Sequence, residues 1–293
     1  MRSTMATFRY LRKLTPQQRA ALAQKRIEGE YSAVQLLDLL RPLAEFDGLN
    51  DRARGKTIWL IVLLIVAMLI TLFVLAEANP MAAWTSVGTM LAAVVVLIAI
   101  EIRLRNLDVS NNVRKIALPF LALLREDTPR DAPLQVQIDF AKPIVKAKQV
   151  GKKPPYQKGR YHRVVDTLYR DAWFSGSAQL ADGSRLRWEV VEDIVVSHCR
   201  KRNPRGKVKL KTKHAKRSQL HVSVALPRRN YQFGELEKSP GTRAVVSTND
   251  KRTLVKLSHK LKSRSLDPFD VRELINLVSA AYRPVSPANQ EAA

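Results

Sequence analysis

Two long apolar runs, separated by four residues, constrain this chain more than any other feature. Residues 57–76 read TIWLIVLLIVAMLITLFVLA, and residues 81–100 read MAAWTSVGTMLAAVVVLIAI. Each run has about 20 residues, which as an α-helix span roughly 30 Å, the thickness of the hydrocarbon core of a bilayer. A buried helix of a soluble protein is the alternative. Two such runs in succession favour a transmembrane helical hairpin over residues 57–102.

The charges that flank the hairpin predict its orientation. Lysine and arginine stand before the first run and after the second, whereas the loop at 77–80 contains neither. The positive-inside rule then places both termini in the cytoplasm, and tryptophans near the span ends favour the headgroup region. We therefore expect a multi-pass protein of the bacterial inner (plasma) membrane. Its predicted membrane-interface residues are Arg52, Arg54, Lys56, Trp59, Trp84, Arg103 and Arg105.

Residues 1–56 are expected to form short amphipathic helices in the cytoplasm, after an irregular basic start that ends near residue 14. Thr15 to Gln18 has the pattern of a helix N-terminus, and the helix is predicted to end near Gly29. Ser32 to Gln35 is a second capping box, and Pro42 should interrupt or bend the helix that follows. These helices are expected either on the membrane surface or packed against protein.

A cytoplasmic helix and linker are predicted for 103–133, with Pro119 kinking the helix or starting a new one. Alternation with period two then predicts a β-rich domain over 134–282. The expected strands are 134–140, 161–168, 172–180, 185–191, 207–213, 219–226, 243–247 and 253–257, and 194–199 is expected either to extend the strand before it or to start a new one. Turn signals include Asp182-Gly183 and Asn203 to Gly206.

The fold class that follows is a membrane α-helical hairpin plus a cytoplasmic α+β domain. That domain is expected to be a small antiparallel β-barrel or sandwich, closed by a C-terminal helix that ends near Ala281. Asp267 and Pro268 should begin this helix, with Asp270 in its first turn. Residues 283–293 are expected to be a disordered tail.

The net charge of +24, from 50 basic and 26 acidic residues, predicts an anionic partner. Ten basic residues and no acid lie between Arg200 and Arg217. Four lysines alternate along a predicted strand, which places them on one face about 6.7 Å apart, where they repel one another. The predicted anion-binding residues are Arg200, Lys201, Arg202, Arg205, Lys207, Lys209, Lys211, Lys213, Lys216 and Arg217.

Three interpretations of this basic run remain open. It can bind acidic lipid headgroups or an acidic protein, it can bind nucleic acid, or it can be a solvated edge strand whose lysines prevent aggregation. No recognised nucleic-acid-binding motif accompanies it.

The sequence gives no positive support for catalysis. It lacks a phosphate-binding loop, GxGxxG, HExxH and a paired-cysteine zinc pattern, so no cofactor or metal is predicted. His198 and Cys199 are adjacent and should point to opposite faces of a strand. The single cysteine also excludes an intrachain disulfide.

The function predicted from the sequence is therefore a non-catalytic membrane anchor or scaffold that presents a basic β-rich domain to an anionic partner. Membrane lipid and a protein partner or homo-oligomer are the expected contacts. One alternative is an oligomeric channel or membrane effector whose cytoplasmic domain senses a ligand. Gly88 and Ala92 have the small-xxx-small spacing of packed membrane helices, although the spans carry no ionisable residue. The other alternative is a membrane-tethered nucleic-acid binder.

Overall fold

The computed structural model describes residues 2–78, 80–202, 206–235 and 241–288, which form two compact units. The first unit contains Met1–Gln24 and Arg41–Val109. The second contains Lys25–Leu40 and Ser110–Ala293. We describe each unit by itself.

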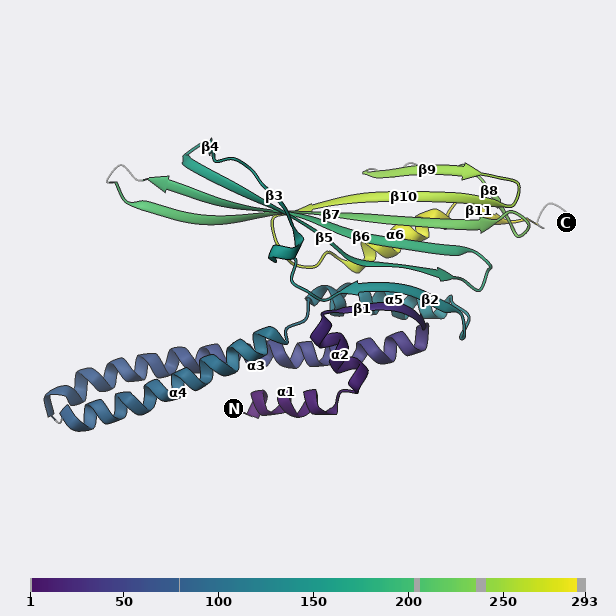
Figure 1. The fold of residues 1–293 in the computed structure, drawn as a ribbon. Helices are drawn as coiled ribbons and strands as arrows, with labels where there is room; N and C mark the ends of the chain where they lie inside the picture. Colours follow the sequence, from purple (N-terminus) through teal and green to yellow (C-terminus); the bar gives the residue numbers. More distant parts are fainter. Residues whose placement is uncertain (1, 79, 203–205, 236–240, 289–293) are drawn as a thin grey trace. The chain divides into compact units, whose positions relative to one another are not determined.

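Two long helices, α3 (Ala33–Ala78) and α4 (Pro80–Asn106), are long and apolar enough to cross a membrane (Figure 1). The first unit contains α4 and the part of α3 that begins at Arg41. Small and branched side chains of α4 are buried, among them Ala83, Val94 and Leu97. Most of the apolar surface is exposed, as at Leu63 (63% exposed) and Phe73 (86%). An apolar surface of this extent is typical of a contact with lipid or with another protein.

The N-terminal segment is more ordered than the sequence predicts. The irregular start expected up to residue 14 is wrong, because Arg2–Lys13 forms helix α1. Its polar side chains have partners on α3, since the Thr7 hydroxyl donates to the Leu49 carbonyl and the Tyr10 hydroxyl donates to the Glu45 carboxylate at 2.6 Å. These contacts are long-range, which explains why a local pattern does not reveal them.

Both predicted capping boxes are confirmed. Thr15 and Gln18 exchange hydrogen bonds at the start of α2 (Pro16–Gln24), and Ser32 and Gln35 do so at the start of α3. The helix expected to reach Gly29 ends earlier, because Arg26–Ser32 forms strand β1. Of the two outcomes expected at Pro42, an interruption or a bend, the interruption is wrong, since α3 continues through it to Ala78.

The second unit is organised around an open antiparallel sheet in the order β1-β2-β5-β6-β7-β10-β9. Its strands after β1 are β2 (Pro133–Asp139), β5 (Tyr161–Gln179), β6 (Arg185–Arg202), β7 (Val208–Pro227), β9 (Thr242–Thr248) and β10 (Arg252–Ser263). Two short strands, β3 (Gln149–Lys152) and β4 (Tyr156–Lys158), also pair with β5. The predicted barrel or sandwich is therefore wrong, because among the described residues β1 and β9 are the two ends of an open path.

Two strand pairs predicted as separate short strands are single long strands, β5 and β7, and β6 is continuous, which is one of the two outcomes expected for 194–199. β5, β6 and β7 each run through the residues where the sequence indicates a break. The breaks coincide in space, since Asp171 pairs with Glu192, which pairs with Ser218. A polar belt therefore crosses the middle of the three strands. In the sequence of each strand alone, the polar residues of this belt indicate a loop.

Helices cover one face of the sheet. A π-helical turn at Val113–Ala117 leads into α5 (Leu118–Glu126), with Pro119 in its first turn as one of the two predicted outcomes. Phe120 of α5 packs edge-to-face on Phe174 and Trp188, at ring-centroid distances of 5.8 and 5.3 Å. A Cβ on Gly176 would lie 2.4 Å from the Trp188 ring, so only glycine fits beneath this indole.

The C-terminal helix is α6 (Val271–Tyr282), which buries Leu274, Leu277 and Ala281. Its cap is Asp270, whose carboxylate accepts from the Arg272 amide, and not Asp267 as predicted.

Part of the predicted disordered tail is ordered, since β11 (Val285–Pro287) pairs with β8 (Tyr231–Phe233). A 3₁₀ turn at Lys146–Lys148 precedes β3.

Candidate anion-binding site

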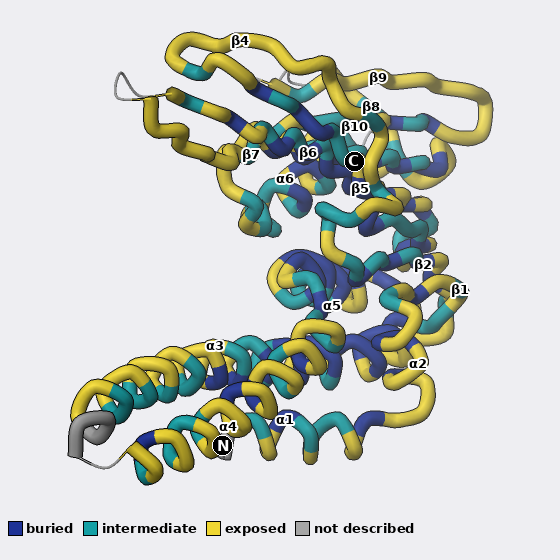
Figure 2. Tube along the Cα trace, turned by 60° about the vertical axis from the view of Figure 1, so that its left-hand side comes forward, coloured by how far each residue is buried: buried dark blue, intermediate teal, exposed yellow. Residues whose placement is uncertain are grey.

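The ends of β5, β6 and β7 form an exposed basic lobe, which we call the basic tip and define as residues 149–165 and 197–213. The tip contains no aspartate or glutamate. From Arg200 to Arg202 and from Gly206 to Lys213 none of the described side chains is buried (Figure 2). Even Leu210 is 81% exposed. Val164 and Cys199 at the base of the tip are buried, and beyond them the tip is a ladder of backbone hydrogen bonds without a hydrophobic core beneath it.

Cations face one another across the strands of the tip. Lys201 on β6 lies directly opposite Lys209 on β7, and Lys211 and Lys213 continue the same face of β7. On the other face, Arg163 on β5 lies opposite Arg200 on β6. Like charges placed directly opposite one another destabilise a sheet, so this arrangement favours a bound anion.

The structure adds basic residues that the sequence reading did not assign to the site. They come from the β3–β4–β5 region, which the antiparallel pairing brings beside the ends of β6 and β7. The sequence shows these residues as a Lys-Lys pair and a Lys-Gly-Arg segment. No pattern in the neighbouring sequence indicates that they lie close to Arg200 in the folded protein. The additional basic residues are Lys152, Lys153, Lys158, Arg160 and Arg163.

An aromatic ring supports one of the tip lysines. The Lys213 ammonium lies 4.7 Å from the centroid of the Tyr161 ring, a cation–π contact between β7 and β5. Contacts of this kind are worth about 0.5–1 kcal/mol at exposed sites. Tyr161 thus holds the lysine side chain over the sheet without neutralising its charge.

Lys216 does not belong with the exposed cations, contrary to its predicted role. Its side chain is 2% exposed, and its ammonium lies 3.2 Å from a Glu192 carboxylate oxygen. It also donates to the backbone carbonyls of Leu266 and Asp267, in the segment before α6. Lys216 is therefore a structural residue that ties this segment to the sheet. Arg217 is exposed as expected, and Arg205 lies outside the described residues.

A second buried charge pair lies beside Glu192. Asp171, directly opposite Glu192, forms an ion pair with Lys148 at 2.8 Å, and Lys148 also reaches Asp139 at 2.9 Å. Burial raises the pKa of Asp171 to about 6, although the hydrogen bond and charge of Lys148 act in the opposite direction. This network fastens the segment before β3 to the sheet and keeps it beside the tip.

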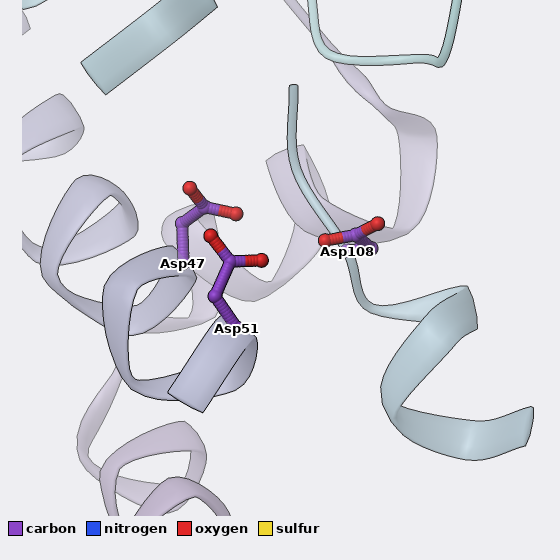
Figure 3. Close-up of side chains that lie close together, drawn as sticks. All are labelled: Asp47, Asp51 and Asp108. Atoms are coloured by element: carbon purple, nitrogen blue, oxygen red, sulfur yellow. The ribbon is translucent and has the colours of Figure 1, made fainter. Parts of the chain in front are cut away.

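The first unit contains the only acidic group among the described residues that could hold a metal ion. One carboxylate oxygen from each of Asp47, Asp51 and Asp108 lies within 4.8 Å of the others (Figure 3). Asp47 accepts from the Val109 amide, and Arg54 reaches Asp108 at 2.8 Å and Glu101 at 3.1 Å. These contacts join the beginning of the hairpin to its end, so the group has a structural role without an ion.

The predicted membrane-interface residues fall into two groups. Arg54 is half-buried in the ion pairs just described. The others are exposed near the ends of the apolar runs, with Trp59 75% and Trp84 66% exposed, and Arg103 stacks over the Phe8 ring at 5.4 Å. The exposed members are Arg52, Lys56, Trp59, Trp84, Arg103 and Arg105.

The adjacent His198 and Cys199 point to opposite faces of β6, as predicted. Cys199 is buried, whereas His198 is exposed and its Nδ1 lies 3.4 Å from the Thr212 hydroxyl. A Cys–His nucleophile pair is therefore not assembled here.

Comparison of the chain with protein-family models, with curated proteins and with solved structures finds no match.

Proposed function

We propose that this protein is a non-catalytic membrane anchor whose basic tip binds acidic lipid headgroups. The two apolar helices form the anchor. The Lys/Arg-rich flanks, by the positive-inside rule, support an orientation in which both termini and the basic tip lie on the cytoplasmic side of a bacterial inner membrane. The observation that carries the proposal is the pairing of cations across the exposed tip strands, with Lys201 opposite Lys209 and Arg163 opposite Arg200.

The exposed apolar surface of the helices supports the anchor. A soluble helix of this composition would bury most of its apolar side chains, but only 6% of the most apolar window of α3 and 17% of that of α4 are buried. Transferring so much apolar surface into lipid is strongly favourable. The short loop between the helices leaves almost nothing on the far side.

The tip suits a lipid surface because its charge is spread over several strands and both faces of the ladder. A membrane surface with many mobile anionic headgroups can contact basic residues that are spread in this way. Each basic residue near anionic lipid contributes about 1 kcal/mol to binding. The hairpin also tethers the tip to a bilayer, which raises the effective concentration of headgroups.

The test uses the full chain reconstituted into vesicles. A fluorophore is attached to Leu210→Cys in a Cys199→Ser background, and the vesicles contain a headgroup-linked quencher. Quenching is expected in phosphatidylcholine vesicles that contain phosphatidylglycerol, and it should disappear in high salt. In vesicles of phosphatidylcholine alone we expect no quenching.

Two triple variants provide the matched comparison. Lys209, Lys211 and Lys213 changed to Gln should weaken the docked state by about 3 kcal/mol, roughly 100-fold. Arg228, Arg229 and Lys251 changed to Gln remove the same charge at the opposite end of β7 and should have no effect. Equal quenching in both kinds of vesicle, or equal effects of the two triple variants, would contradict the proposal. Salt-sensitive binding of an oligonucleotide without lipid quenching would favour a nucleic-acid partner instead.

A further inference from the structure

The sheet face that α5 and α6 leave uncovered carries a groove of about 880 Å³. Most of the residues that line it belong to two continuous cross-strand rows, which take alternating positions on each strand. One row is Glu30, Gln135, Ser177, Arg187, Ser223, Lys256 and Val245, and the other is Glu28, Gln137, Ser175, Glu189, His221, Ser258 and Arg243. The groove therefore crosses the strands instead of running along them.

The floor of the groove is made of small polar side chains. Ser175, Ser177, Ser223 and Ser258 are half-buried, and the two glutamines are beside them on β2. A serine hydroxyl and a glutamine amide each donate and accept hydrogen bonds. The Ser177 hydroxyl donates to Gln135 at 3.3 Å, and the Gln135 amide donates to Glu30 at 2.8 Å. This lining matches a ligand that presents N–H and C=O groups in alternation.

Charge is distributed unequally along the groove. Glu28 and Glu30 lie at the β1 end, and Arg243 and Lys256 lie at the β9–β10 end. Arg26 pairs with Glu28 at 2.6 Å, so the negative end depends chiefly on Glu30. In the middle, Arg187 and Glu189 offset one another. A complementary ligand carries a basic group at one end and an acidic group at the other.

The lining also disfavours other ligand classes. Glutamates at one end and in the middle repel a polyphosphate or a nucleic acid. Trp188 is the only Phe, Tyr or Trp among the described residues of the lining, and it is 2% exposed and contacts Phe120 on the helix side. Apart from the half-buried His221 imidazole, no flat ring is therefore offered to a sugar or a base. The polar floor does not suit a lipid tail.

We propose that this groove binds an extended polar peptide segment, with its acidic end at Arg243 and Lys256 and its basic end at Glu30. The seven strands of the main path span about 29 Å at about 4.8 Å per spacing. At about 3.3 Å per residue this length accommodates about nine residues. The site is independent of the basic tip and of its lipid contact.

The test measures binding of two labelled peptides with blocked ends to the full chain in neutral detergent micelles, by fluorescence anisotropy. One peptide, Lys-Lys-Gln-Ser-Gly-Ser-Gln-Glu-Glu, separates the charges, and the other, Lys-Glu-Gln-Ser-Gly-Ser-Gln-Lys-Glu, has the same composition with both signs at each end. The charge-separated peptide should bind at least tenfold more tightly.

Variants then locate the site. Arg243→Glu with Lys256→Glu should weaken binding at least tenfold, and adding Glu30→Lys should restore most of it, because the same peptide then binds in the opposite direction. Arg228→Glu with Arg229→Glu, outside the groove, should leave binding unchanged. Equal affinity for the two peptides, no binding at millimolar concentration, or no rescue would overturn the proposal. Self-association of the chain that is lost with Arg243→Glu and Lys256→Glu would also overturn it, since the occupant would then be a second copy.

Discussion

Replacing Lys216 by methionine tests how the middle of the sheet is held together. Lys216 and Glu192 are 2% and 1% exposed, and the Ser218 hydroxyl donates to the same carboxylate oxygen of Glu192. Methionine keeps the length of the side chain but leaves the carboxylate buried without its cation. Breaking a buried pair in this way typically costs about 3–5 kcal/mol. The variant also loses the bonds to the segment before α6.

The double variant Lys216→Met with Glu192→Met separates the two causes. It removes the stranded charge, so it should recover the part of the loss that comes from that charge. A deficit of about 1–3 kcal/mol should remain, because the Ser218 hydroxyl and the Leu266 and Asp267 carbonyls still lack their partners. Lys213→Met, on the exposed part of the same strand, is the control and should change stability by less than about 0.5 kcal/mol.

Trp173 and Trp188 provide the assay, because they are 1% and 2% exposed in the core of the sheet. The full chain is titrated with urea in mild detergent, and tryptophan fluorescence reports unfolding of the sheet. With a slope of about 2 kcal/mol per molar, the Lys216→Met midpoint should fall by about 2 M urea. A fall worth less than about 1 kcal/mol, or a double variant no more stable than the single one, would refute this account of the pair.

Three further outcomes follow from other parts of the structure. Gly176→Ala should destabilise the sheet by about 1–3 kcal/mol in the same titration, because its Cβ would overlap the Trp188 ring; an unchanged midpoint would show that the indole can move. Asp171 has its pKa raised from 3.8 to about 6 in the folded protein, so the folded state binds the extra proton and stability should fall as pH rises from about 4 to about 6, then level off. Asp171→Asn should flatten that profile in urea titrations followed by tryptophan fluorescence, and a slope that persists would assign it to another group. Asp270→Ala should cost about 1 kcal/mol, because it removes the α6 cap, whereas Asp267→Ala should cost less.

The apolar helices could be predicted because length and composition alone identify them, without any partner. The same holds for the two capping boxes and for the turn at Asp182-Gly183, where Gly183 has φ +83°. Each of these signals lies within four residues of sequence. The neighbouring residues alone determine these local structures, and tertiary packing does not change them.

The long strands could not be predicted, because their continuity depends on pairing between strands. Asp171, Glu192 and Lys216 each interrupt an apolar alternation, which ordinarily indicates a loop. In the folded protein they meet and satisfy one another, so the interruption becomes a buried belt. The open sheet has a similar origin, since β1 comes from a segment before the apolar runs and pairs with a strand more than a hundred residues later.

The candidate anion-binding site could be predicted only in part, because some of its residues come together through pairing between strands. The alternation of Lys209, Lys211 and Lys213 on an exposed strand is visible in the sequence, and the structure has them on one face. Two further facts become visible only when the pairing of the strands is known. The basic residues of β3 to β5 then lie beside the ends of β6 and β7, and Lys216 is bonded to Glu192 and does not belong to the anion-binding residues. The groove required this pairing even more, since its two rows draw one residue from each of seven strands.

The length of β6 and β7 has a consequence for how this protein can change. The strands have 18 and 20 residues, and their far ends extend beyond the hydrophobic core. Amide exchange should therefore become faster step by step from Val190 toward Arg202, because opening the ladder there exposes little apolar surface. Substitutions in that overhang alter charge without disturbing packing. The charge of the tip can thus change while the rest of the sheet stays intact.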